Sequence, residues 1–225
     1  MSMTLNLVNE AAFQKAVQSL ETLNRAAVFH PTGTGKSCIA WKVVEAHPQT
    51  TFFWLVAGAQ RLALRQAELT RYNGGTLPGN VRFCDREKLA AATPEQWVRL
   101  GEQKPGCVVL DCYHELSAVC WAQSVQKLLR MCPQAKVLGL GVPNGAPVCA
   151  AAQELFADCI VSHMTVAEAM AAGTMPVPSA YAALLWPQEE ELATLRARIK
   201  NLCMPKGDTS LRVQYEELSW SLRQV

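Results

Sequence analysis

The stretch HPTGTGKS, from His30 to Ser37, decides the fold that this sequence predicts. A short apolar run, AAVF at residues 26–29, precedes it, and a helical pattern at residues 36–46 follows it. Gly33 and Gly35 allow the backbone to curl so that successive N–H groups point inward at the N-terminus of the following helix. Inward-pointing N–H groups of this kind bind phosphate oxygens. The stretch therefore predicts a phosphate-binding loop between a strand and a helix.

The same loop also has side chains that could bind a nucleotide. It matches the P-loop pattern at every position except the first. The Lys36 ammonium would reach the β- and γ-phosphates, and the Ser37 hydroxyl would be a ligand of Mg²⁺. His30 stands where Gly or Ala is usual, and we interpret it as a residue that packs the loop. We expect ATP or ADP with Mg²⁺ to bind through Thr32, Gly33, Thr34, Gly35, Lys36 and Ser37.

The composition is that of an ordinary globular protein. Half of the 225 residues are hydrophobic and 18% are charged, and a net charge of +2 permits a nucleic-acid partner without arguing for one. The nine cysteines are scattered and form no C-x-x-C pair, which excludes a zinc ribbon and a thioredoxin-like motif. The N-terminus has no signal-peptide pattern, and no apolar run approaches a membrane span. We expect a cytoplasmic protein that does not enter the membrane.

Short apolar runs alternate with longer helical patterns along the chain, which is typical of a parallel sheet with crossover helices. The expected fold is a three-layer α/β domain with a mostly parallel central sheet. The expected strands are residues 26–29, 51–56, 80–84, 106–110, 135–140 and 160–162. The expected helices are residues 9–23, 36–46, 59–72 and 120–131, a helical pattern broken near Thr93-Pro94, and a capped helix between Thr165 and Gly173.

The character of the sequence changes after Pro187. The segment QEEELATLRARIKNL is a charged amphipathic helical pattern, and Gly207-Asp208 separates it from a last helical segment that runs to Val225. This part is too short and too charged for a core of its own. We therefore expect one domain over residues 1–185 and a helical extension over residues 186–225.

Further segments follow one another in the order found in a known family. They are Phe13-Gln14, LVAGAQRLALRQ from Leu55, VVLDCYHEL from Val108, KVLGLGVPNG from Lys136 and FADCIVSHMTVAEAMAAGTMPVPSAY from Phe156. Together with the phosphate loop, they resemble the first RecA-like, ATP-binding domain of a superfamily-two helicase of the DEAD/DEAH type. The resemblance covers about residues 10–180 and implies a P-loop NTPase fold.

The resemblance implies roles for residues outside the loop. Gln14 matches the glutamine that reads adenine, for which an amide offers one donor and one acceptor. Asp111 matches the carboxylate that holds Mg²⁺, and His114 matches the residue that links the nucleotide site to the next motif. Arg61 or Arg65 matches the contact to the backbone of DNA or RNA, although each fits a solvated helix charge equally well.

The sequence also departs from the family pattern. Cys112 stands where the family has the glutamate that activates water, and a mostly protonated thiol cannot act as that base. Loss of such a group costs about 10²–10⁴-fold in rate. Glu115 lies three positions further on and does not replace it, and Gly141-Val142-Pro143 replaces the family's Ser/Thr-Ala-Thr hydroxyls. The residues after Trp186 are too few for the second RecA-like domain that supplies arginine fingers, a contribution of about 10³–10⁵-fold.

The pattern favours a nucleotide-binding, helicase-like domain with weak or absent hydrolysis of its own, acting with nucleic acid or a partner chain. The alternative is an active nucleic-acid-dependent ATPase that is completed by a second RecA-like domain elsewhere. A small-molecule kinase would show an arginine-rich lid, which we do not find. A purely structural domain does not explain why Lys36, Ser37 and Asp111 are all present.

Overall fold

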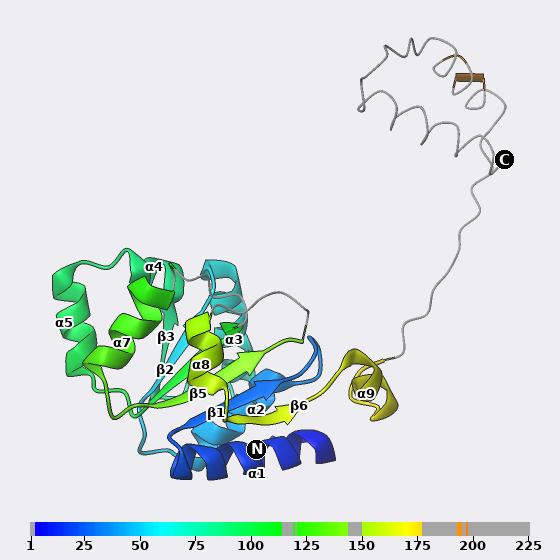
Figure 1. Ribbon diagram of the computed structural model, residues 1–225, viewed down its shortest axis with the longest axis horizontal. Helices are drawn as coiled ribbons and strands as arrows, with labels where there is room; N and C mark the ends of the chain where they lie inside the picture. Colours follow the sequence, from blue (N-terminus) through cyan, green and yellow to red (C-terminus); the bar gives the residue numbers. More distant parts are fainter. Residues whose placement is uncertain are drawn as a thin grey trace. The chain divides into compact units, whose positions relative to one another are not determined.

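Six parallel strands form one sheet in the order β3-β2-β4-β5-β1-β6 (Figure 1). The computed structural model describes residues 3–113, 119, 121–143, 150–176, 193, 194 and 197. The strands are β1 (Arg25–Phe29), β2 (Phe52–Val56), β3 (Val81–Asp85), β4 (Cys107–Asp111), β5 (Lys136–Gly141) and β6 (Ile160–His163). Each expected strand is confirmed to within one residue at either end, and the sheet is parallel throughout rather than mostly parallel.

Helices cover both faces of this sheet, which gives the three layers that the sequence predicts (Figure 1). The first layer contains α1 (Leu7–Thr22), α2 (Lys36–Ala46) and α3 (Ala59–Tyr72). The second contains α4 (Arg86–Ala90), α5 (Pro94–Glu102), the π-helix η2 (Trp121–Val125), α7 (Gln126–Met131) and α8 (Ala150–Phe156). Helix α9 (Val166–Ala171) follows β6 along the chain. No helix in the described part of the chain is long and apolar enough to cross a membrane.

Strand β2 is apolar at every position because both of its faces are covered. In β2, Phe52, Trp54 and Val56 pack in the core of the first layer, and Phe53 and Leu55 pack in the core of the second. All five residues are buried. The continuous run FFWLV therefore reads as a strand in the interior of the sheet, with side chains that alternate between two cores.

Helix α8 is an element that the sequence did not predict. Its seven residues include three consecutive alanines and show little periodicity. Phe156 at its end is fully buried and packs with Tyr113, their ring centroids 4.8 Å apart. A Cβ at Gly139 of β5 would lie 2.8 Å from the Phe156 ring, so the glycine makes room for it. Tertiary packing therefore accounts for this helix better than its local sequence does.

The internal contacts divide the chain into two units, residues 1–177 and 178–225. The elements above belong to the first unit. The boundary that the sequence predicts at residue 185, and the helical extension after it, stay predictions.

Candidate nucleotide-binding site

The candidate site lies at the carboxyl edge of the sheet, where parallel strands place the loops that follow them. Strand β5 lies between β1 and β4, and the pairings Phe29–Gly141 and Leu140–Asp111 bring all three strands to one level. The phosphate loop follows β1, and Asp111 is the last residue of β4. The fold therefore places the predicted phosphate loop and the predicted acidic residue at the same edge, one strand apart.

The phosphate loop has the curled backbone that its glycines predict. Gly33 and Gly35 both have φ of +89°, a conformation that favours glycine, and Gly35 is the N-cap of α2. The buried Thr34 hydroxyl donates to the Pro31 carbonyl over 2.8 Å and closes the loop internally. Thr32 lies exposed beside it. The loop is thus held in its curled form by its own backbone and side chains.

The Lys36 ammonium lies inside the loop and donates to the carbonyl oxygens of His30 and Pro31, each over 2.8 Å. Burial lowers the pKa of Lys36 to about 8, although Cys112 and Asp111 partly oppose this shift and Arg65 adds to it. The Lys36 ammonium is therefore close enough to Asp111 and Cys112, at the end of β4, for their charges to act on it. A bound phosphate would give this ammonium an anionic partner in place of two neutral carbonyls.

Asn9 of α1 belongs to the site and was missed by the sequence reasoning. Its Nδ2 donates to the Thr34 carbonyl over 2.8 Å, and a Cβ at Gly35 would lie 2.9 Å from that nitrogen. Asn9 is only 4% exposed, and its Oδ1 has no partner among the described residues. The sequence did contain a signal for this role. Asn9 is a polar residue on the same helix face as the apolar residues Ala12 and Ala16.

Gln14, the predicted reader of adenine, is exposed on α1, and its Nε2 donates to Glu10 Oε1 over 2.9 Å. Its role stays a prediction. His30, by contrast, is fully buried, and its Nε2 lies 2.7 Å from the Ser162 hydroxyl of β6. Burial, followed by the charges of Lys36 and His163, lowers the pKa of His30 to about 4. A neutral His30 that ties the loop to β6 agrees with a packing role.

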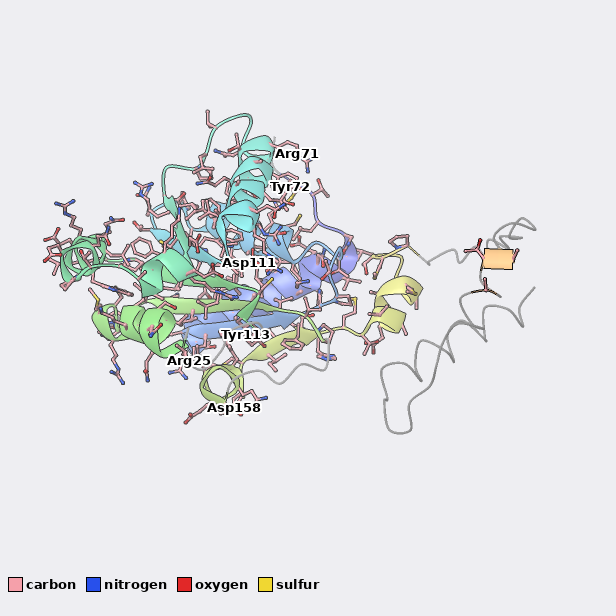
Figure 2. The ribbon with its side chains drawn as sticks, turned by 90° about the horizontal axis from the view of Figure 1, so that it is seen from above. Arg25, Arg71, Tyr72, Asp111, Tyr113 and Asp158 are labelled. Carbon is pink, nitrogen blue, oxygen red and sulfur yellow. The ribbon has the colours of Figure 1, made fainter. Side chains whose placement is uncertain are left out.

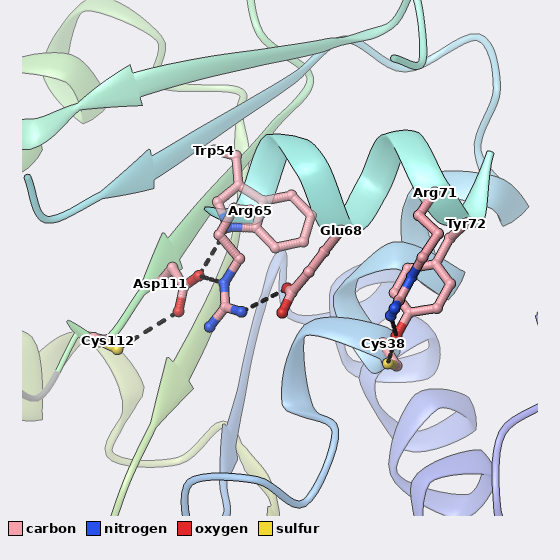
Figure 3. Close-up of polar contacts among 8 residues, drawn as sticks. All are labelled: Cys38, Trp54, Arg65, Glu68, Arg71, Tyr72, Asp111 and Cys112. Atoms are coloured by element: carbon pink, nitrogen blue, oxygen red, sulfur yellow. Dashed lines mark hydrogen bonds and ion pairs between the residues drawn. The ribbon is translucent and has the colours of Figure 1, made fainter. Parts of the chain in front are cut away.

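Arg65 of α3 forms an ion pair with Asp111, a contact that the sequence did not predict (Figure 3). Arg65 Nε lies 2.6 Å from Asp111 Oδ2, and Arg65 Nη1 lies 2.7 Å from Glu68 Oε2. Trp54 Nε1 lies 3.4 Å from the same Asp111 oxygen. Burial lowers the pKa of Arg65, but the charges and hydrogen bonds of Asp111 and Glu68 raise it above its usual range. Arg65 is therefore a charged part of this site.

Arg61 and Arg65, which fit the nucleic-acid contact equally well in the sequence, have different environments in the structure. Arg65 is directed to the buried end of β4, whereas Arg61 is exposed in the first turn of α3. Of the two, Arg61 is the one placed on the outside of the domain. The nucleic-acid contact itself stays a prediction for both.

Cys112 has a φ of +61°, which is uncommon for a residue other than glycine. Its Sγ lies 3.6 Å from Asp111 Oδ1, so the thiol donates toward the carboxylate. Its carbonyl accepts from Arg86 Nη1 over 3.4 Å. A thiol in this arrangement offers water no basic oxygen. His114 and Glu115 lie outside the described residues, as do residues 144–149 after the altered Gly141-Val142-Pro143 segment.

The predicted Mg²⁺ ligands do not form a ready cation site in this arrangement. Both Asp111 oxygens have donors, Arg65 and Trp54 on Oδ2 and Cys112 on Oδ1. The other predicted ligand, Ser37, is half-buried in the first turn of α2. Within the described ranges, no group of three His, Cys, Asp or Glu side chains could hold a metal ion. We therefore derive no catalytic step through Mg²⁺.

Comparison with known proteins gives a fold but no family. No protein-family model matches this chain, and no curated protein sequence matches it. Among solved structures, a hypothetical ATP-dependent RNA helicase from Sulfolobus tokodaii is similar with a TM-score of 0.51 and 11% identity, over 72% of this chain and 52% of that one. This chain thus spans about half the length of that protein.

Two other solved structures have lower TM-scores. The ATP-dependent Type ISP restriction-modification enzyme LlaBIII, bound to DNA, has 13% identity and a TM-score of 0.42, over 62% of this chain and 13% of that one. Bacteroides sp Pif1 in complex with ADP-AlF4 has 13% identity and a TM-score of 0.43, over 91% of this chain and 48% of that one. The first comparison and the all-parallel sheet together define the class: a three-layer α/β domain with the RecA-like fold of helicases.

Proposed function

We propose that this chain is a nucleotide-binding, helicase-like domain that holds ATP or ADP and hydrolyses it weakly or not at all on its own. One observation carries the proposal. A formed phosphate loop with Lys36 inside it lies at the same sheet edge as Asp111, whose neighbour Cys112 is a thiol where hydrolysis needs a carboxylate.

Binding rests on the backbone of the loop and on Lys36. The N–H groups of Lys36 and Ser37 precede the first backbone hydrogen bond of α2, which Cys38 donates to the Gly35 carbonyl over 2.9 Å. They would be the donors for phosphate oxygens. Lys36 would exchange two carbonyl contacts for a charge-assisted bond to phosphate. Gln14 would contact adenine only after it leaves Glu10, an exposed and therefore weak partner.

Weak hydrolysis follows from the end of β4. A general base contributes about 10²–10⁴-fold to a rate, and the Cys112 thiol is a poor substitute. In related phosphoryl-transfer sites, an arginine from a second domain or partner contributes about 10³–10⁵-fold. We propose that partner chains or nucleic acid, DNA or RNA, act on the nucleotide-bound form of the domain. The exposed Arg61 is the proposed contact to a nucleic-acid backbone.

The test is a calorimetric titration of the protein with ATP and with ADP in the presence of Mg²⁺, followed by a phosphate-release assay on the same sample. We expect binding that is lost in Lys36→Ala, and no release above background. Absence of binding would reject the proposal. Release that single-stranded DNA or RNA stimulates would instead favour the active ATPase completed by a second domain.

A further inference from the structure

The Arg65–Asp111 ion pair is the most buried charge pair described at the site. Asp111 is only 3% exposed, and the Arg65 side chain is 23% exposed. The 2.6 Å distance between Arg65 Nε and Asp111 Oδ2 is short for a charge-assisted bond. Glu68 holds the same guanidinium through Nη1, so Arg65 is fixed from two sides. The carboxylate expected to meet a metal ion is therefore already neutralised by a side chain of its own chain.

A metal ion bound directly to Asp111 Oδ2 would have to displace this arrangement. Separating a buried pair is strongly unfavourable, because it leaves a charge without compensation. Mg²⁺ also gives up its water reluctantly and usually relies on carboxylates together with substrate phosphates. Once released, Arg65 would share the site with a divalent cation and with Lys36, whose pKa its charge already lowers. Like charges in a partly buried site oppose the entry of the ion.

Arg65 can itself do part of what a metal does for a phosphate. A guanidinium has five N–H donors, and the bonds to Asp111 and Glu68 use only two of them. Planar guanidinium groups bind phosphate oxygens well, and Arg65 keeps its charge at any physiological pH. Lys36 and Arg65 would then be two fixed cations beside one phosphate loop.

We propose that this site binds nucleoside diphosphates and triphosphates in their metal-free form, with Arg65 as the cation that pairs with Asp111 in place of Mg²⁺. The inference rests on the proposed nucleotide binding and specifies the ionic form of the ligand. It predicts a domain that takes up nucleotide as readily without Mg²⁺ as with it.

The experiment is a calorimetric titration with ATP in two media, one with excess Mg²⁺ and one with EDTA. We expect dissociation constants that differ by less than fivefold for the unaltered chain. A loss of fivefold or more in EDTA would overturn the inference but leave nucleotide binding intact. Absence of binding in both media would reject the proposed function itself, so the two failures are distinguishable.

Variants of the ion pair sharpen the test. Asp111→Asn removes the carboxylate, and we expect ATP affinity in both media to be kept or raised, because Arg65 is released toward phosphate. A site in which Asp111 holds Mg²⁺ would instead lose affinity in the Mg²⁺ medium only. Arg65→Gln should weaken binding in EDTA by tenfold or more and make it dependent on Mg²⁺. Unchanged binding of this variant in EDTA would also overturn the inference.

Two controls keep these results interpretable. Arg71→Gln makes the same change in the last turn of α3, where Arg71 lies over the Tyr72 ring, away from Asp111 (Figures 2 and 3). We expect it to bind ATP like the unaltered chain in both media. Because Arg65→Gln leaves a buried carboxylate unpaired, the double variant with Asp111→Asn restores neutrality and is measured beside it. Thermal unfolding of each variant checks that it is folded.

Discussion

Two chain segments meet at the carboxyl edge of the sheet, and different parts of the chain give each its structure. The loop after β1 is made mainly of backbone, with two glycines at positive φ and a lysine folded inside it. The end of β4 depends on side chains, and there Asp111 is held by Arg65 and followed by Cys112. In the proposed function, it is the second of these two segments that lacks a group needed for hydrolysis.

In the proposed function, nucleotide binding and hydrolysis therefore depend on different parts of the site. A backbone cradle needs little more than glycines and a helix N-terminus, so it tolerates changes elsewhere. Hydrolysis also needs a general base at one position, and in the proposed function the Cys112 thiol at that position slows it by about 10²–10⁴-fold. The following predictions test the division between a binding loop and an altered catalytic strand end.

The largest expected effect comes from Lys36→Ala. Removing the ammonium deletes a charge-assisted bond to phosphate, and ATP affinity should fall about 10- to 150-fold in a calorimetric titration. Lys42→Ala is the matched control, because Lys42 lies on the same helix and pairs with Glu45 outside the loop. If both variants bind ATP equally, the loop after β1 is not the binding element.

Gly35→Ala tests the backbone of the loop. The substitution places an ordinary residue at φ of +89° and a Cβ 2.9 Å from Asn9 Nδ2. We expect the free energy of unfolding to fall by more than the ~1–2 kcal/mol that left-handed strain alone costs, as measured by urea unfolding.

Gly33→Ala is the comparison for that measurement. It has the same φ, but nothing lies within 4 Å of the added Cβ, so only the strain remains. A smaller loss for Gly33→Ala supports the contact with Asn9. Equal losses would show that Asn9 does not constrain the loop.

The pH dependence of binding reports Lys36. Its pKa of about 8 means that the free protein loses this positive charge as pH rises through 8. Since phosphate needs the charged form, ATP affinity should fall about tenfold between pH 7 and pH 9. Calorimetry at pH 8 in buffers of different ionisation enthalpy should also detect proton uptake on binding. A flat affinity over this range would contradict the environment assigned to Lys36.

The smallest expected effect is that of Cys112→Glu. A restored base should raise phosphate release by less than about tenfold, because this substitution does not supply the arginine that contributes about 10³–10⁵-fold in related phosphoryl-transfer sites. Cys112→Ser, which restores no base, is the control and should match the unaltered chain. A rise of 100-fold or more in phosphate release would show that the Cys112 thiol is the main cause of slow hydrolysis. The difference between the two strand ends would then depend on that one residue.

The local parts of the structure were predictable from the sequence. Strand β2 and the first four residues of β4 are unbroken apolar runs, and the capping box of Thr165 and Glu168 begins α9 as expected. The phosphate loop is also local, because its glycines and its helix start lie within eight residues. Such features depend on neighbouring residues, whose preferences a sequence states directly.

The contacts that define the candidate site required the tertiary structure. Arg65 and Asp111 are 46 residues apart, and Asn9 and Thr34 are 25 apart, so no local pattern links them. In the sequence, Arg65 fitted a solvated helix charge equally well. The structure shows its contact with Asp111, because the strand order places α3 beside the end of β4. The sequence by itself determined the six strands, most of the helices and the curled loop after β1. Only the tertiary structure decided which charges face each other, because that depends on the order of strands in the sheet.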